Sequence, residues 1–270
     1  MLPIATQRGR PPPRRLGLAA ACAAILAAAA HPALAAGART LSVAAAANLE
    51  PVLPELKAGF EAERPAAEVR MTLGSSGNFA AQIRNGAPFD VLLSADAEYP
   101  QKLVEAGLGR REDLAIYATG ALVVWAPADT RLDLEGRGLA ALADPALRKL
   151  AIANPALAPY GRAAEAALRA AGVYASVKDR LVLGENVGQA AQFAQSGAAD
   201  AAMIPWSLTF APALRGGKVL RLPPGAAPPQ PQAALVLAGA REPELARAFV
   251  RFLAGPRGQA VLSRYGYGPP

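Results

Sequence analysis

The sequence predicts an α/β protein in which parallel sheets are flanked by helices. Two observations lead to this prediction. Short apolar runs alternate along the chain with segments whose apolar residues recur at helical spacing, and this alternation is typical of parallel sheets covered by helices. Once an N-terminal export segment is set aside, residues 37–270 remain, which is enough chain for one large or two modest α/β domains.

The first part of the chain passes from strand to helix three times. Leu53, Leu56 and Phe60 recur at helical spacing, whereas residues 68–73 alternate between polar and apolar in the manner of a strand. The predicted strands are Leu41–Ala46, Glu68–Leu73 and Asp90–Leu93, and the predicted helices are Leu49–Glu63, Asn78–Asn85 and Tyr99–Ala106.

The rest of the chain continues the alternation and closes with two helices. The proline-rich stretch at residues 222–229 is expected to be a loop, because an apolar strand follows it directly. Strands are predicted at Ala121–Trp125, Leu150–Ala153, Leu181–Leu183, Ala201–Ile204 and Ala233–Leu237. Helices are predicted at Gly161–Ala171, Gly188–Ser196, Pro243–Leu253 and Arg257–Arg264.

The N-terminal segment has the layout of an export signal. Four arginines within residues 1–15 precede an apolar run at residues 16–30, and a small-residue sequence ends at Ala35 and Ala36. A basic start, a short apolar stretch and an A-x-A exit are typical of a signal peptide, which we place at residues 1–36. The apolar stretch is short for a membrane anchor, and its alanines bury little surface. We therefore expect an extracytoplasmic protein.

Removal of that segment also removes cysteine and histidine. Cys22 and His31, the single residues of their types, both lie in it, so no thiol, imidazole or Cys/His metal set remains. An enzyme would then need a Ser–Lys or carboxylate pair, and Ser76 has no obvious lysine partner, so we do not expect one. Four of the 28 basic residues leave with the signal, and 24 against 21 acidic residues gives +3. This small excess, without a long basic block, disfavours a nucleic-acid partner.

Four predicted strand-to-helix turns share a hydrogen-bonding character and, apart from Glu185, are neutral. In open α/β sheets the ligand lies at the carboxyl ends of the strands, where helix N-termini offer unpaired N–H groups and a positive dipole. Each turn alone has an ordinary interpretation, since Asn and Ser commonly cap helices. Two such turns in each half of the chain favour a cleft in which helix ends converge on one anion. The turns are Ala45–Leu49, Gly74–Gly77, Pro159–Gly161 and Glu185–Gly188.

Several segments, taken in order, resemble the periplasmic molybdate-binding proteins of ABC importers. They are Val43–Leu49, Gly74–Asn78, Ala87–Asp96, Ala121–Pro127, Glu185–Val187 and Gly255–Gly266. The match spans essentially the whole mature chain, and Gly-Ser-Ser-Gly and Ser-Ala-Asp are its most specific pieces. The resemblance implies a two-lobed type II periplasmic binding protein, with a mixed, mostly parallel sheet in each lobe and the ligand cleft between the lobes.

The resemblance also implies which residues bind the ligand. Ser76 matches a serine that binds the oxyanion through its hydroxyl and backbone N–H, and Val187 matches a backbone donor. Asn48 sits where one branch has serine and another asparagine, and whether it binds by side chain or backbone stays open. Tyr160 falls where some members have a backbone donor and others a tyrosine hydroxyl. The branch of the family with serine at the position of Asn48 has a ligand-binding tyrosine where this sequence has Pro205. Proline has no hydroxyl, so Tyr160 is expected to supply the hydroxyl instead.

These residues imply a receptor for a fully deprotonated tetrahedral oxyanion. Such a dianion only accepts hydrogen bonds, whereas hydrogen phosphate would need a buried acceptor as well. Molybdate, tungstate and sulfate share charge and shape, so this argument does not separate them. The resemblance implies molybdate, together with tungstate, as the expected ligand, and sulfate stays the alternative. No cofactor is expected. The only metal expected is the molybdenum of molybdate, bound by the same four residues.

The resemblance extends to lobe boundaries and partners. Lobe I is expected at residues 37–120 and 218–270, and lobe II at residues 121–217. The expected partners are the oxyanion and the membrane permease of a molybdate ABC importer, with no nucleic acid, and the protein is expected to be a periplasmic monomer. A ligand-sensing domain of a transcription factor shares the lobed architecture, but the export signal and the lack of a helix-turn-helix segment argue against it.

Overall fold

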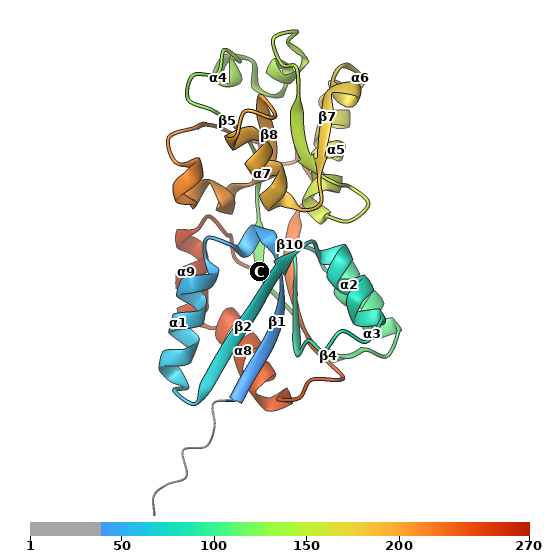
Figure 1. Cartoon of the computed structure of the whole chain (residues 1–270), viewed down its shortest axis with the longest axis vertical. Helices are drawn as coiled ribbons and strands as arrows, with labels where there is room; N and C mark the ends of the chain where they lie inside the picture. Colours follow the sequence, from blue (N-terminus) through green and yellow to red (C-terminus); the bar gives the residue numbers. More distant parts are fainter. Residues whose placement is uncertain (1–38) are drawn as a thin grey trace, which may run out of the picture. The chain divides into compact units, whose positions relative to one another are not determined.

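The computed structural model describes residues 39–270, and the expected signal peptide lies outside the described residues. The described residues contain two five-stranded sheets, one in each of two lobes (Figure 1). Both sheets have three parallel strands followed in the strand order by one reversed strand and a last strand that runs with the first three. The predicted fold class, with a mixed, mostly parallel sheet in each lobe, is therefore confirmed.

The first sheet has the strand order β2-β1-β3-β10-β4. β1 pairs in parallel with β2 and β3, whereas β10 runs antiparallel to β3 and β4. The four residues of β3 are all buried, as expected for a strand covered by helices on both faces. The strands are β1 (Arg39–Ala46), β2 (Ala67–Gly74), β3 (Val91–Ser94), β4 (Gly109–Gly120) and β10 (Gln230–Leu237).

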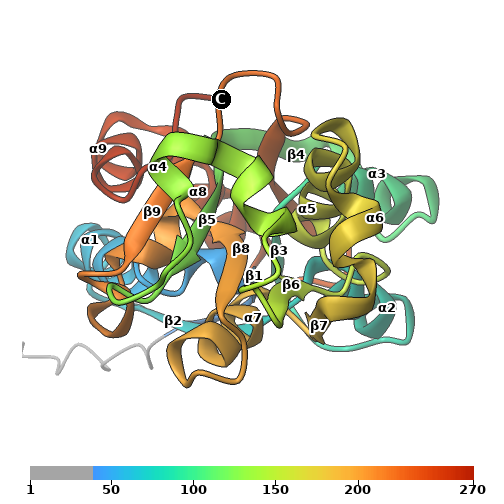
Figure 2. The same cartoon turned by 90° about the horizontal axis from the view of Figure 1, so that it is seen from above.

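Helices cover both faces of the first sheet (Figures 1 and 2). On one face, the ring of Phe60 packs edge-on against Phe249 and Phe252, with centroids 5.0 and 5.6 Å away. On the other face, Phe79 and Leu103 belong to a separate apolar cluster. The helices are α1 (Leu53–Glu63), α8 (Pro243–Ala254) and α9 (Pro256–Arg264) on the first face, and α2 (Ser76–Arg84) and α3 (Glu98–Glu105) on the second.

The second sheet repeats the topology with the order β7-β6-β8-β5-β9. Its strands are β5 (Leu122–Ala126), β6 (Leu150–Ala153), β7 (Leu181–Gly184), β8 (Ala201–Pro205) and β9 (Lys218–Arg221). Helices α5 (Pro159–Ala170) and α7 (Val187–Gln195) lie on opposite faces of it (Figure 2). Shorter helices are α4 (Leu134–Arg137), α6 (Tyr174–Val177) and the 3-10 turns η1 (Ala47–Leu49), η2 (Gly138–Ala143), η3 (Lys178–Arg180), η4 (Trp206–Phe210) and η5 (Pro212–Leu214).

The chain passes between the sheets twice. It crosses first between β4 and β5, through Ala121, and again between β9 and β10. The return to the first sheet follows Arg221, which is later than the boundary expected at residue 218. The reason is that Lys218–Arg221 pairs antiparallel with β5 and so belongs to the second sheet.

The predicted strands and helices all correspond to observed ones, with small differences at their ends. The largest difference is at α1, which begins at Leu53 because η1 and a turn occupy residues 47–52. Two strands, β4 and β9, were not predicted. In β4, four charged residues, Arg110–Asp113, follow the initial Gly109 and conceal the alternation expected of a strand.

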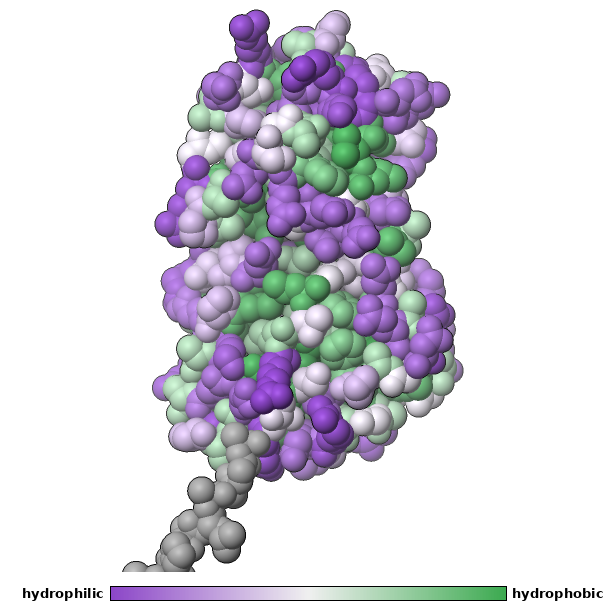
Figure 3. All heavy atoms as spheres, in the orientation of Figure 1, coloured by the Kyte–Doolittle hydropathy of each residue, from purple (hydrophilic) through white to green (hydrophobic). Residues whose placement is uncertain are grey.

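The surface is mostly polar. In the face shown in Figure 3, polar side chains cover much of both lobes, and apolar side chains form separate patches. Leu73, Leu183 and Val219 are the large apolar side chains that stand exposed within residues 39–270. None of the helices in this range is long and apolar enough to cross a membrane.

Candidate functional site

The four predicted site residues line one cavity between the two sheets. Asn48 and Ser76 follow strands of the first sheet, and Tyr160 and Val187 follow strands of the second. The cavity is small, since the centre of a water-sized sphere can occupy only about 10 Å³ of it. Pockets for drug-sized ligands begin at about 300 Å³, so this cavity is far too small for such a ligand. The remaining lining residues are Ala46, Ala47, Gly74, Ser75, Ala95, Ala158, Pro159 and Asn186.

Ser76, the first residue of α2, has two donors available for a ligand. Its Oγ accepts a hydrogen bond from the amide of Ala95 at 3.0 Å, so the hydroxyl hydrogen remains free to be donated. The next amides of the helix are occupied, since Gly77 donates to the second lobe and Asn78 donates to Ser75 Oγ at 3.3 Å. The amide of Ser76 itself has no partner among the described residues.

Tyr160 lies in the first turn of α5, directly after Pro159. Its hydroxyl is buried and forms no hydrogen bond of good geometry within residues 39–270, although the side chain of Gln232 lies near enough to act against the rise in its pKa. The oxygen lies against Gly120, where a Cβ atom would stand only 1.9 Å away, so glycine is required for this close approach. Burial raises the pKa of Tyr160 well above its usual 10, and the hydroxyl therefore keeps its hydrogen at neutral pH.

Val187 is the first residue of α7 and contributes its backbone. Asn186 caps the helix by accepting from the amide of Gln189 at 3.1 Å, and the side chain of Gln189 accepts from the amide of Glu185 at 2.7 Å. The amide of Val187 has no partner in the described part of the chain. Its apolar side chain is buried and cannot donate a hydrogen bond, so the N–H is the donor that Val187 has for a ligand.

Asn48 lies in η1, and its side-chain hydrogens are both in use. Nδ2 donates to Gln232 Oε1 and to the hydroxyl of Tyr267, each at 2.8 Å. The backbone oxygen accepts from Ser207 Oγ at 2.8 Å and from Tyr267 at 2.9 Å. The side-chain oxygen Oδ1 is buried without a partner among the described residues. Any donation from Asn48 to an anion in this arrangement therefore comes from its backbone amide.

Direct contacts join the two lobes beside the cavity. The amide of Gly77 donates to the carbonyl of Leu157 at 2.9 Å. Arg162 of α5 forms an ion pair with Asp96 and donates through Nη1 to the hydroxyl of Tyr99 at 3.2 Å. Burial raises the pKa of Asp96, and its hydrogen bonds and Arg162 act against that rise. The cavity is therefore bounded by polar contacts that span the two lobes.

The cavity lining is neutral and rich in donors. None of its residues is Lys, Arg, Asp, Glu or His. Helices α2, α5 and α7 all begin at it, and a helix N-terminus presents free N–H groups and the positive end of the helix dipole. Within residues 39–270, no group of three or more His, Cys, Asp or Glu is arranged to hold a metal ion. The arrangement is suited to an anion rather than to a bare metal cation.

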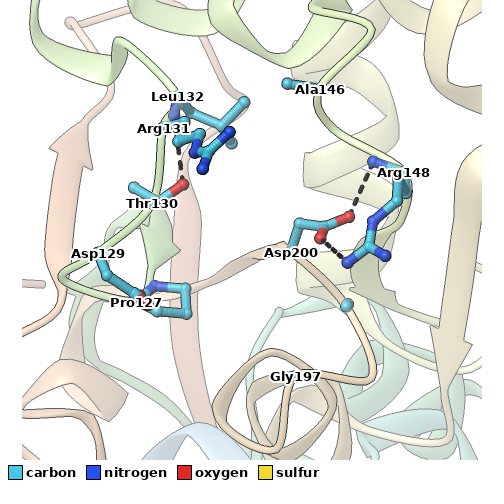
Figure 4. Close-up of a pocket in the computed structure, with 10 residues that line it drawn as sticks. Pro127, Asp129, Thr130, Arg131, Leu132, Ala146, Arg148, Gly197 and Asp200 are labelled. Atoms are coloured by element: carbon cyan, nitrogen blue, oxygen red, sulfur yellow. Dashed lines mark hydrogen bonds and ion pairs between the residues drawn. The ribbon is translucent and has the colours of Figure 1, made fainter.

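A wider depression lies on the second lobe and contains none of the four predicted residues (Figure 4). It is lined in part by Arg131, Arg148 and Asp200. The carboxylate of Asp200 is occupied by the side chain of Arg148 at 2.9 Å and by the amides of Arg148 and Lys149, each at 2.8 Å. The smaller cavity is the candidate ligand site, because it has buried donors without partners in the described chain, whereas the carboxylate of Asp200 in this depression is already paired.

Two sheets of the same topology, linked by two crossings and enclosing a donor-lined cavity, define a two-lobed solute-binding protein. The chain belongs to the family of bacterial extracellular solute-binding proteins, whose model matches residues 41–268. It is therefore a binding protein and not an enzyme.

The chain is similar to molybdate-binding proteins named ModA. It is 35% identical over 237 residues to that of Azotobacter vinelandii, covering 87% of this chain and 92% of the relative. For that of Rhodobacter capsulatus the identity is 36% over 235 residues, covering 87% and 90%. The predicted resemblance is confirmed.

Solved structures agree with the two-lobed fold. The periplasmic molybdate-binding protein of Azotobacter vinelandii matches with a TM-score of 0.78 at 33% identity, covering 85% of this chain and 99% of that chain. The sulfate-binding protein SubI of Mycobacterium tuberculosis H37Rv matches with a TM-score of 0.71 at 16% identity, covering 86% and 87%. The second likeness concerns the fold alone, so the fold by itself does not select the anion.

Three residues around the cavity were not predicted. Gln232, Tyr267 and Ser207 hold Asn48, yet they lie on β10, in the C-terminal segment and in η4. Asp96 ends one of the segments that carry the resemblance, but its ion pair with Arg162 was not predicted either. Nothing in the local pattern signals such pairs, because each contact joins segments that are far apart in the chain.

Proposed function

We propose that this protein captures molybdate outside the cytoplasm and delivers it to the membrane permease of an ABC importer. The observation that supports this most directly is the small neutral cavity where three helix N-termini meet. The similarity to molybdate-binding proteins of two bacteria selects molybdate among anions of this shape.

Hydrogen-bond chemistry connects the cavity to a tetrahedral oxyanion. Molybdate at neutral pH carries two negative charges and four acceptor oxygens, so unpaired N–H and O–H groups match it. Leaving such a buried donor without a partner costs about 1–3 kcal/mol, and the bound dianion would remove that cost at several positions. Neutral dipoles also replace the water that the anion loses on entering the cavity.

Four residues are proposed to hold the anion. Ser76 donates through its hydroxyl and its amide, and Val187 donates through its amide. Tyr160 donates through the buried hydroxyl that has no partner within residues 39–270. Asn48 takes part through its backbone amide, because its side-chain hydrogens are bound to Gln232 and Tyr267.

The remaining parts of the proposal concern location and partners. Residues 1–36 are proposed to direct export and to be removed, which leaves a periplasmic monomer without a cofactor. Tungstate is proposed as a second ligand, since it shares the charge and shape of molybdate. The importer is supported by the likeness, at 27% identity over 165 residues, to a Bacillus subtilis protein named as a putative ABC transporter substrate-binding lipoprotein.

Calorimetric titration of the purified protein with molybdate, tungstate, sulfate and phosphate tests this proposal. We expect one-to-one binding of molybdate and tungstate, much weaker binding of sulfate, and no heat from phosphate. Phosphate is the informative control, because the proton of hydrogen phosphate needs an acceptor. Asn48 Oδ1 is a buried oxygen without a partner in the described chain, so heat from phosphate would show that this oxygen faces the ligand and that the lining is not made of donors alone. If sulfate bound most tightly, the site assignment would stand and sulfate would be the ligand. If none of the oxyanions gave heat, the site assignment would be refuted.

A further inference from the structure

We infer that Tyr267 is a positioning residue whose hydroxyl, together with that of Ser207, holds Asn48 so that its backbone amide faces the cavity. The inference rests on the proposed function, because it concerns the support of the proposed site. It assigns a role to the C-terminal segment, which does not line the cavity.

The backbone delivers Tyr267 to this place independently of its hydroxyl. After α9, Gly266 adopts a left-handed conformation with φ of 81° and turns the chain. Gly268 then exchanges two backbone hydrogen bonds with Thr119 of β4, at 3.0 and 2.8 Å, and the amide of Tyr267 donates to the carbonyl of Leu262 at 3.2 Å. The ring is buried with 5% of its surface exposed, so removal of the hydroxyl alone leaves its packing in place.

The hydroxyl of Tyr267 contacts Asn48 at two points. It accepts from Asn48 Nδ2 at 2.8 Å and donates to the backbone oxygen of Asn48 at 2.9 Å, with Ser207 Oγ 3.2 Å away. Ser207 donates to the same backbone oxygen at 2.8 Å, and Gln232 takes the other side-chain hydrogen. The side-chain amide and the backbone carbonyl of Asn48 are thus both held by hydrogen bonds to residues that do not line the cavity.

The turn that contains Asn48 needs this external support. η1 has only three residues, and Ala46 at its start provides no side-chain cap. The backbone hydrogen bonds in and after η1 run from the amides of Glu50 and Val52 to the carbonyls of Ala47 and Leu49, at 3.2 and 2.9 Å, and none of them involves the amide or carbonyl of Asn48. Ser207 belongs to η4, which follows strand β8 of the second lobe. Its hydrogen bond to Asn48 therefore also links the two lobes.

The hydroxyl remains a donor under physiological conditions. Burial raises the pKa of Tyr267, and its hydrogen bonds with Ser207 and Asn48 lower it by less. The phenol therefore keeps its hydrogen at neutral pH, and the geometry around Asn48 does not change with ordinary variation of pH.

The test is Tyr267→Phe in the full protein, with Tyr117→Phe as its matched control. Tyr117 is equally buried and belongs to the neighbouring strand β4, but its hydroxyl has no partner in the described chain. Molybdate affinity is measured calorimetrically at a temperature where all variants are fully folded, so a change in global stability alone does not alter it. We expect affinity about 5- to 30-fold weaker for Tyr267→Phe, as for loss of a buried hydrogen bond, and unchanged affinity for Tyr117→Phe.

Two further measurements separate positioning from a general loss of packing. Ser207→Ala is expected to weaken binding similarly. The loss of binding free energy in the double variant is expected not to exceed the sum of the two single losses, because both hydroxyls act on the same peptide group. In the ligand-free protein, NMR signals of the Asn48 side-chain amide and the backbone amides of residues 47–48 are expected to shift in Tyr267→Phe and not in Tyr117→Phe.

Equal affinity of Tyr267→Phe and the unchanged protein would overturn the inference, as would equal losses in Tyr267→Phe and Tyr117→Phe. If the unchanged protein binds no oxyanion, the proposed function fails separately. The NMR comparison then still decides whether Tyr267 holds Asn48, since it requires no ligand.

Discussion

Arg162 of the second lobe forms an ion pair with Asp96 of the first lobe, next to the donor-lined cavity. The guanidinium also lies 5.2 Å from the ring centre of Tyr99 and donates to its hydroxyl. Asp96 is held in turn by the hydroxyl of Ser94, at 3.0 Å, and by the amide of Tyr99, at 3.2 Å. The carboxylate of Asp96 is therefore held in place by the first lobe alone, whereas its ion pair forms only when the second lobe lies close to the first.

Replacement of Arg162 is expected to weaken molybdate binding without unfolding either lobe. Arg162→Gln removes a partly buried ion pair worth about 1 kcal/mol between the lobes, which corresponds to roughly fivefold in affinity. Calorimetry at low and high salt checks this, since the contribution of the pair should shrink as salt rises. Arg169→Gln is the control, because Arg169 pairs with Glu165 inside the same helix and reaches no residue of the first lobe. Equal losses in both variants would contradict a role between the lobes.

Ser75 and Ser76 are adjacent, and their replacements are expected to have different effects. Ser76→Ala removes a hydroxyl that is free to donate and should weaken molybdate binding about 10- to 100-fold. Ser75→Ala removes the cap of α2 and should lower the free energy of unfolding by about 1 kcal/mol, with a smaller effect on affinity. Urea unfolding and calorimetry on both variants distinguish the two roles. If Ser75→Ala proved the more damaging to affinity, the assignment of the donor would be wrong.

Tyr160→Phe is expected to stabilise the ligand-free protein while weakening binding. The buried hydroxyl forms no hydrogen bond of good geometry in the described chain, and its contact with the side chain of Gln232 is weak. Removal of such a buried polar group favours the folded state by about 1 kcal/mol. The same substitution removes a donor to the oxyanion, so affinity should fall about tenfold or more. Thermal unfolding without ligand measures the expected gain in stability, and calorimetry with molybdate measures the expected loss of affinity. A loss of stability together with unchanged affinity would show that the hydroxyl has another partner.

Asp113 is expected to make stability depend on acid pH. Hydrogen bonds from Arg247, at 2.8 and 3.2 Å, and from Arg110, at 3.0 Å, lower the pKa of Asp113 below its usual 3.8. Its stabilising contribution is therefore complete above the usual pKa and is lost as pH falls through the lowered one. Asp113→Asn should cost about 1 kcal/mol at pH 7, and the difference from the unchanged protein should shrink steadily below pH 4.

Denaturant unfolding at several pH values measures this difference. Asp129→Asn is the comparison, because Asp129 is exposed and has no ion pair within the described residues. We expect it to change stability little at any pH. A cost for Asp113→Asn that persisted unchanged into acid would mean that packing, and not charge, is responsible.

The sequence was sufficient where the signal is local. Helical spacing and strand alternation recur within a few residues, so β1, α2, β6 and α7 were predicted close to their observed ends. The turns that line the cavity were identifiable because Gly, Ser, Asn and Pro have characteristic conformations there. β4 was missed because its first residues are charged and its place in the sheet depends on β10, which follows more than 100 residues later.

The sequence by itself determined the class of fold, the family and the turns that line the cavity. Only the tertiary structure decided how the polar groups of those turns are paired. Asn48 is separated by 184 residues from Gln232 and by 219 from Tyr267, and Asp96 by 66 from Arg162. Hydrogen bonds between such distant residues leave no periodic trace in the sequence, because they depend on how the packed elements bring separate strand ends together.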